Sequence, residues 1–328
     1  MVSLPGRLAQ VTLEQTLDQP VTRRESEAAV SFAAMMKTIV VATDLGGQSE
    51  AALEYARKLA GAYGARIVLA HGLDPLEYAA VESVPGNVLQ RLPEEARTVL
   101  DEMVAELTLA GIHSHSELRQ GAVVEMLLDV IRQYEAGLVV VGSRGRDGVG
   151  PVAVGAIVEQ LVRRAPCPVL AVAADWNAGA YRPVPGGPVL LAMERNESTM
   201  AAVEAARSLA EKFERTLIVV HARTAAEASA FLNPCATTLE EFGVRTTGAL
   251  TVRCVVKDGS PADAVPRAVA QYGPCILVAG VKRHSDTTGR HGTVFSLLAS
   301  SRAPVLCVPA ESAVEHPQEA ADVAIEIG

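Results

Sequence analysis

The chain has 328 residues, which at about 150 residues per domain corresponds to two domains. Its composition, 49% hydrophobic and 20% charged, excludes disorder for most of the chain. The net charge of -9 argues against a nucleic-acid groove or a basic membrane-binding face, and the longest apolar runs are far shorter than the ~20 residues of a membrane-spanning helix. We therefore expect a soluble two-domain protein without a nucleic-acid or membrane partner.

From residue 38 onward, patterns typical of strands and helices alternate along the chain. Short β-branched and apolar runs predict buried strands, and apolar residues at helical spacing predict helices. The expected strands are 38–43, 66–71, 115–119, 138–141 and 169–173, and the expected helices are 49–63, 93–110, 123–134 and 155–164. Pro93 is expected in the first turn of its helix, where its missing N–H costs nothing. This alternation predicts an α/β fold, a doubly wound five-stranded parallel sheet flanked by helices.

The second half of the sequence repeats the first. Residues 36–60 align without a gap on residues 186–210, and the same offset of 150 places Asp44 on Glu194 and His71 on His221. Farther along, the offset shrinks to 138 and aligns Gly142 with Gly280. Such self-similarity indicates duplication of one domain. We predict domains at 37–176 and 186–310, joined by a linker rich in Gly and Pro over 177–187.

Two terminal segments fall outside the repeat. Residues 1–36 are polar and lack a strong period, which predicts a mobile extension or an incorrectly assigned start, and residues 311–328 are expected to be an acidic tail. The five cysteines form no CxxC pair, their number is odd and no signal peptide is recognisable. These features favour a reducing cytoplasm.

A glycine-rich loop after the fourth predicted strand is the clearest candidate binding feature. It starts at Gly142, continues through Arg144 and Gly145, and enters a helix at Gly155. Glycines let backbone N–H groups crowd around an anion, and the helix N-terminus and Arg144 add positive charge. Asp44 follows the first strand and should lie at the same sheet edge, where open α/β sheets bind ligands. The loop alone leaves phosphate binding and a purely structural turn both open.

These residues resemble the pattern of the universal stress protein family. That family carries G-2x-G-9x-G-(S/T) after its fourth strand, and this chain has Gly142, Gly145 and Gly155 at those spacings, followed by Ala156 instead of Ser or Thr. Asp44 matches the family's Asp at the end of the first strand, and residues 158–170 match its closing helix and strand. The resemblance extends over both predicted domains.

The resemblance implies tandem domains of the adenine nucleotide alpha hydrolase-like fold. It implies that the first domain binds ATP, with Mg²⁺ on the phosphates, through Asp44, Gly142, Arg144, Gly145, Gly155 and Ala156. It implies a role in stress survival or signalling without a dedicated catalytic apparatus, and no catalytic triad or metal site stands out in the sequence. It also implies that the last strands, 169–173 and 305–309, pair as an internal pseudo-dimer. Whether two chains pair further stays open.

The second copy departs from the family pattern. Glu194 stands in the place of Asp44, and Arg283 replaces the second glycine, although Gly292 and Thr293 restore the end of the motif. We expect a degenerate structural domain there, with binding of a different anion as the alternative. For the whole chain, a ligand-free interaction protein and a slow ATPase that depends on Asp44 stay open beside the ATP-binding module.

Overall fold

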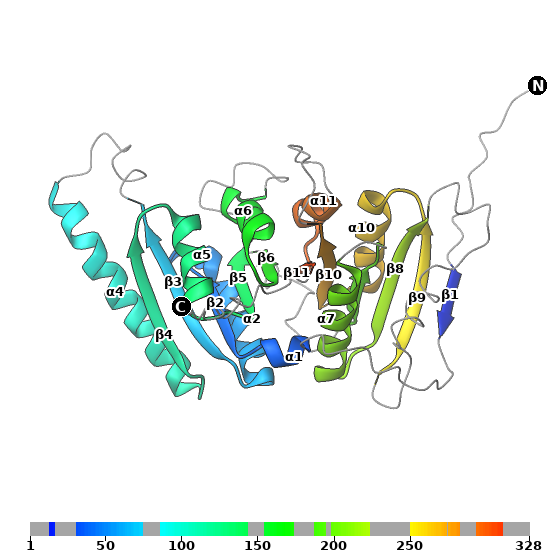
Figure 1. Cartoon of the computed structure of the whole chain (residues 1–328), viewed down its shortest axis with the longest axis horizontal. Coiled ribbons are helices and arrows are strands. Elements are labelled where there is room, and N and C mark those ends of the chain that lie inside the picture. Colours follow the sequence, from blue (N-terminus) through cyan, green and yellow to red (C-terminus); the bar gives the residue numbers. More distant parts are fainter. Residues whose placement is uncertain are drawn as a thin grey trace, which may run out of the picture.

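The computed structural model describes residues 13–16, 31–74, 86–143, 154–173, 187–194, 198–223, 250–273, 275–282 and 293–310. Residues 31–173 are called the first half here and residues 187–310 the second half. All strands belong to one 11-stranded sheet (Figure 1). The first half contributes the strands β2 (Thr38–Ala42), β3 (Arg66–Leu73), β4 (Ser114–Gln120), β5 (Leu138–Gly142) and β6 (Val169–Val172). The second half contributes β7 (Val189–Ala192), β8 (Leu217–Arg223), β9 (Val252–Asp258), β10 (Ile276–Val281) and β11 (Val305–Pro309).

Helices cover both faces of this sheet. In the first half they are α2 (Gly47–Tyr63), α4 (Gly86–Leu109), α5 (Val123–Gln133) and α6 (Ala156–Arg164). In the second half they are α7 (Thr199–Lys212), α10 (Pro261–Tyr272) and α11 (Thr293–Ser300). No helix in the described ranges is long and apolar enough to cross a bilayer.

Both halves have the same strand order. It runs β4-β3-β2-β5-β6 in the first half and β9-β8-β7-β10-β11 in the second, and every pairing within a half is parallel. The predicted alternation of five strands and four helices in the first half is confirmed, as is the doubly wound α/β class. Parallel neighbours need crossover helices, which explains why the two faces are covered and the strands are apolar.

The two halves join through their last strands. β11 runs antiparallel to β6, with Val305 opposite Ala171 and Cys307 opposite Val169, so the predicted pairing of these strands is confirmed. Figure 1 shows β6 and β11 at the middle of the molecule. Because the sheet is continuous, each of its faces carries one hydrophobic core that extends through both halves.

Contacts of α2 with the second half strengthen the junction. Tyr63 and Phe213, which occupy equivalent positions of the repeat, pack edge to face with ring centroids 6.4 Å apart. The buried Tyr55 donates a hydrogen bond of 3.1 Å to the carbonyl oxygen of Cys275, just before β10. The halves therefore share packing and polar contacts beyond the strand pair.

Two parts of residues 1–36, for which we expect a mobile extension, form secondary-structure elements. The strand β1 (Leu13–Thr16) pairs with β9, and the short helix α1 (Phe32–Met35) buries Phe32 against Tyr63 at a centroid distance of 6.3 Å. Apolar burial at the junction orders α1 although the segment has no helical period. The predicted acidic tail and all of the predicted linker except Gly187 lie outside the described residues.

The prediction for Pro93 was wrong. α4 begins at Gly86, so Pro93 lies inside the helix instead of in its first turn. A proline there removes one backbone hydrogen bond. The long helix tolerates the loss because farther along it buries Leu100 and Leu107 in the core.

Candidate functional site

The candidate site lies at the carboxyl edge of the first half. β2 has β3 on one side and β5 on the other, so strand order reverses between β2 and β5. The register pairs Val41 with Val140, which brings Gly142, at the end of β5, beside the end of β2 that leads into Asp44. The predicted meeting of these two residues at one sheet edge follows from this register.

A network of short hydrogen bonds holds Asp44 in the turn between β2 and α2. Its Oδ1 atom accepts a bond of 2.9 Å from the N–H of Gly46, and the intervening Leu45 has a left-handed φ of 57°. The Leu45 N–H donates to Thr43 Oγ1 at 3.0 Å, and Thr43 Oγ1 lies 2.9 Å from Ser49 Oγ. A non-glycine residue in this conformation is strained and persists only where its surroundings fix it, and such residues cluster at functional sites. The Asp44 carboxylate is thus held in place and half-buried.

The ends of the glycine-rich loop meet above β5. The N–H of Gly155 donates to the carbonyl oxygen of Ser143 at 3.1 Å, and the N–H of Ser143 donates to Val172 on β6 at 2.8 Å. Gly155 is the N-cap residue of α6 in extended conformation, and Ala156 is the first helical residue. No side chain of the described residues caps α6. Within the part of the chain that the structure describes, the first amides of this helix thus have no side-chain acceptor, and amides of this kind bind anions. Arg144 and Gly145 lie outside the described residues.

A pocket beside Asp44 adds apolar residues that the sequence did not single out. Its lining includes His71, Leu73 and, from α4, Leu92, Ala96 and Val99. The Nδ1 atom of His71 lies 2.8 Å from the carbonyl oxygen of Thr43, which ties the end of β3 to the turn that carries Asp44. The apolar face of α4 signals burial in the sequence, but only the fold shows that this face reaches the edge where Asp44 lies.

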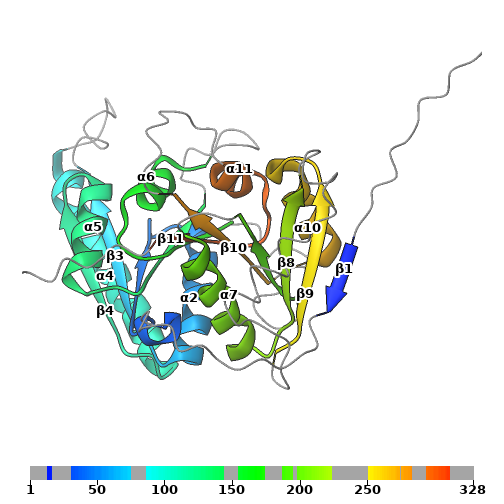
Figure 2. The same cartoon turned by 45° about the vertical axis from the view of Figure 1, so that its right-hand side comes forward.

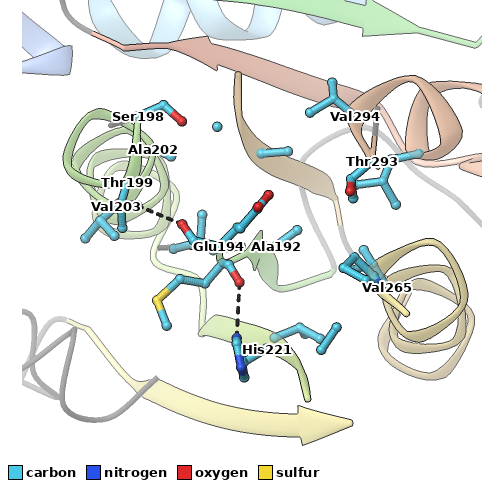
Figure 3. Close-up of a pocket in the computed structure, with 18 residues that line it drawn as sticks. Ala192, Glu194, Ser198, Thr199, Ala202, Val203, His221, Val265, Thr293 and Val294 are labelled. Carbon is cyan, nitrogen blue, oxygen red and sulfur yellow. Dashed lines mark hydrogen bonds between the residues drawn. The ribbon is translucent and has the colours of Figure 1, made fainter. Parts of the chain in front are cut away.

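The second half has a pocket at the equivalent edge (Figure 3). His221, the equivalent of His71, has its Nδ1 atom 3.4 Å from the carbonyl oxygen of Met193 and so repeats the contact of the first half. Glu194, the equivalent of Asp44, forms an ion pair of 2.8 Å with Lys282. Lys282 is the equivalent of Arg144, because these two residues are 138 positions apart, as are Gly142 and Gly280. This spacing is the sequence signal that could have pointed to Lys282.

Gly280 has a packing role in this second pocket. A Cβ atom at this position would lie 2.2 Å from Oγ and 3.0 Å from Cβ of Ser198, a fully buried residue at the start of α7. Gly280 matches the family motif, but the reason for a glycine at this position is that Ser198 leaves no room for a Cβ atom. Arg283 and Gly292 lie outside the described residues, and Thr293 begins α11.

Neither edge presents a ready metal site. Within the described ranges there is no group of three or more His, Cys, Asp or Glu side chains that could hold a metal ion. The four cysteines that the structure describes, Cys167, Cys254, Cys275 and Cys307, are buried and form no disulfide with one another. Burial raises the pKa of the Cys275 thiol to about 11 and that of Cys307 to about 12, so neither is an activated nucleophile.

Comparisons with known proteins agree with this architecture. The model of the universal stress protein family matches residues 35–173. A universal stress protein of Thermus aquaticus is 34% identical over 139 residues, which are 42% of this chain and 99% of that protein. The crystal structure of a universal stress protein from Archaeoglobus fulgidus has a TM-score of 0.65 at 18% identity and covers 84% of this chain and 99% of its own. A universal stress protein solved in complex with cAMP is 24% identical, with a TM-score of 0.33, over 42% of this chain and 98% of its own.

The match to the Thermus protein extends over nearly all of that relative, and the Archaeoglobus structure shares the fold across both halves. The chain belongs to the universal stress protein family.

Proposed function

We propose that this protein binds ATP at the carboxyl edge of its first half and acts as a non-enzymatic module in stress response or signalling. Occupancy by the nucleotide would alter an interaction with a protein partner. One observation carries the proposal: the uncapped N-terminus of α6 lies at the sheet edge where Asp44 and Gly142 follow adjacent strands. An uncapped helix N-terminus favours phosphate through its N–H groups and its partial positive charge.

Each part of the site suits one part of the nucleotide. The amide of Ala156, at the start of α6, would receive the phosphates, while Gly155 precedes it as the N-cap residue and Arg144 and Gly145 complete the loop. The carboxylate of Asp44 is an acceptor for ribose hydroxyls. The apolar lining beside it, from Leu73 and the α4 residues, suits the flat faces of a base. Mg²⁺, when bound, would neutralise phosphate charge.

The organisation of the chain is part of the proposal. We place the two domains at residues 37–176 and 186–310 as copies of one fold, because both halves repeat the same strand order and the same histidine-to-backbone contact. The second copy, in which Glu194 pairs with Lys282 and Arg283 replaces the second glycine of the motif, would not bind ATP. A cytoplasmic location accords with buried cysteines that form no disulfide among the described residues.

Isothermal titration of ATP into the purified protein tests the proposal. We expect binding with a stoichiometry near one, and no heat of binding for Gly145→Arg, which copies Arg283 into the first half. Ala156→Ser restores the family hydroxyl and should tighten binding about fivefold, as one hydrogen bond contributes about 1 kcal/mol. Lys282→Ala is the matched control and should leave the affinity unchanged.

Titration, capture of a protein partner and an assay for phosphate release together separate the alternatives. Absence of binding at millimolar ATP would leave the ligand-free interaction protein, whose partner capture Gly145→Arg would not affect. Release of phosphate that Asp44→Ala abolishes would instead indicate a slow ATPase.

A further inference from the structure

The two outer edges of the 11-stranded sheet differ in how they are protected. β4 ends the sheet on one side and β9 would end it on the other, and both strands have seven residues. An edge strand presents a row of unpaired N–H and C=O groups, which is a template for pairing with another strand. Proteins block such edges with charged side chains or by covering them.

β4 carries its own protection. Its sequence, SHSELRQ, is polar, and none of its residues is fully buried. Glu117 and Arg119 form an ion pair of 3.1 Å, and Tyr134 donates a hydrogen bond to Glu117. Charged and polar side chains of this kind disfavour docking of another strand.

β9 carries charged residues toward its ends, at Arg253, Lys257 and Asp258, but its centre is apolar. Its sequence is VRCVVKD, and Val252, Cys254, Val255 and Val256 are all buried. The structure covers its edge with the strand β1, from a segment that precedes the first half (Figures 1 and 2). The antiparallel register pairs Leu13 with Val256 and Thr16 with Arg253.

We propose that the β9 edge is an interaction surface for an added antiparallel strand, which β1 occupies within the chain. When β1 is removed, the surface pairs with the β9 edge of a second copy of this protein. This inference does not depend on nucleotide binding.

A second copy fits this edge because identical edges can pair about a twofold axis. A pair centred on Cys254 sets Val252 of one copy opposite Val256 of the other, and Arg253 opposite Val255, so apolar side chains meet and like charges stay apart. A pair centred on Val255 would oppose Arg253 and Lys257, which is unfavourable. Of these two registers, the sequence of β9 favours the one centred on Cys254.

Light scattering on size-exclusion fractions over a range of concentrations tests the proposal with three proteins. The full chain and a form lacking residues 1–12, which keeps β1, should have the same number of chains per particle. A form lacking residues 1–30, which keeps α1, should show twice that number at high concentration. A synthetic peptide of residues 9–20 should reverse the doubling, and the same peptide with Glu14→Pro and Gln15→Pro should not.

Hydrogen exchange on the full chain gives an independent readout. Successive residues of a strand alternate between facing the neighbouring strand and facing away, so Glu14→Pro with Gln15→Pro removes at least one donor toward β9. We expect faster exchange of β9 amides and unchanged exchange in β8. The proposal is overturned if β9 exchange is unaltered, if the form lacking residues 1–30 keeps the full-chain mass, or if its association is not reversed by the peptide.

Discussion

Replacing Gly280 by alanine tests whether this glycine serves packing in the second half. The new Cβ would lie 2.2 Å from Ser198 Oγ and 3.4 Å from the Ser198 carbonyl oxygen. Contacts under 3.0 Å force a neighbour to move, and Ser198 is fully buried at the N-cap of α7. Overpacking of this kind costs about 1–3 kcal/mol. The free energy of unfolding of Gly280→Ala should fall by that amount, which lowers the midpoint of thermal unfolding by roughly 2–4 °C for each kcal/mol in a domain of this size.

A double-mutant cycle identifies the cause. Ser198→Gly removes both side-chain atoms that the new Cβ would meet, so Gly280→Ala should cost less than about 0.5 kcal/mol in that background, with a coupling of at least about 1 kcal/mol. Urea unfolding followed by circular dichroism measures the four proteins. Equal costs of Gly280→Ala with and without Ser198 would refute the packing explanation. The ATP binding that we propose for the first half should be the same in all four proteins.

Three further outcomes follow from the structure. Gly61→Ala should raise the free energy of unfolding by about 0.5–1 kcal/mol, because the position lies within α2 and an added Cβ meets nothing within 4 Å. An unchanged or lower midpoint of urea unfolding would contradict this. Tyr55→Phe removes the hydrogen bond of 3.1 Å to Cys275 between the halves, so the free energy of unfolding should fall by about 1 kcal/mol in thermal or urea unfolding. An unchanged free energy of unfolding would contradict this. Burial raises the pKa of Cys307 to about 12, above about 8.5 in the unfolded chain, so its contribution to stability is complete below pH ~8.5 and is lost as pH rises through about 12. Cys307→Ala should therefore reduce the decline of unfolding free energy between pH 8 and 10.5, and an equally steep decline in the variant would exclude this cause.

Local pattern was sufficient to predict the fold of the first half. Runs such as Thr38–Ala42 are strand-sized and β-branched, and the alternation of such runs with helical periods allows few topologies, because parallel strands require crossover helices. The same rule placed Asp44 and Gly142 at one edge. Helix boundaries were less predictable: α4 extends past Pro93 because burial of its apolar face outweighs one missing backbone hydrogen bond.

The nature of the second site was decided by tertiary structure. Gly280 matches the phosphate motif in sequence, yet it is explained by Ser198, 82 residues earlier, and Glu194 forms an ion pair with Lys282, 88 residues later. Such contacts depend on how elements distant in sequence pack, and no local period encodes them. The strand β1 is a similar case, since four residues carry too little pattern to predict a strand, and β1 gains its hydrogen bonds only because β9 presents an uncovered edge. The sequence alone thus determined the class of fold and the edge that carries the first site, through periodicity and the rules of parallel sheets. Packing between distant residues determined which side chains surround the second copy of the motif and which sheet edge is covered.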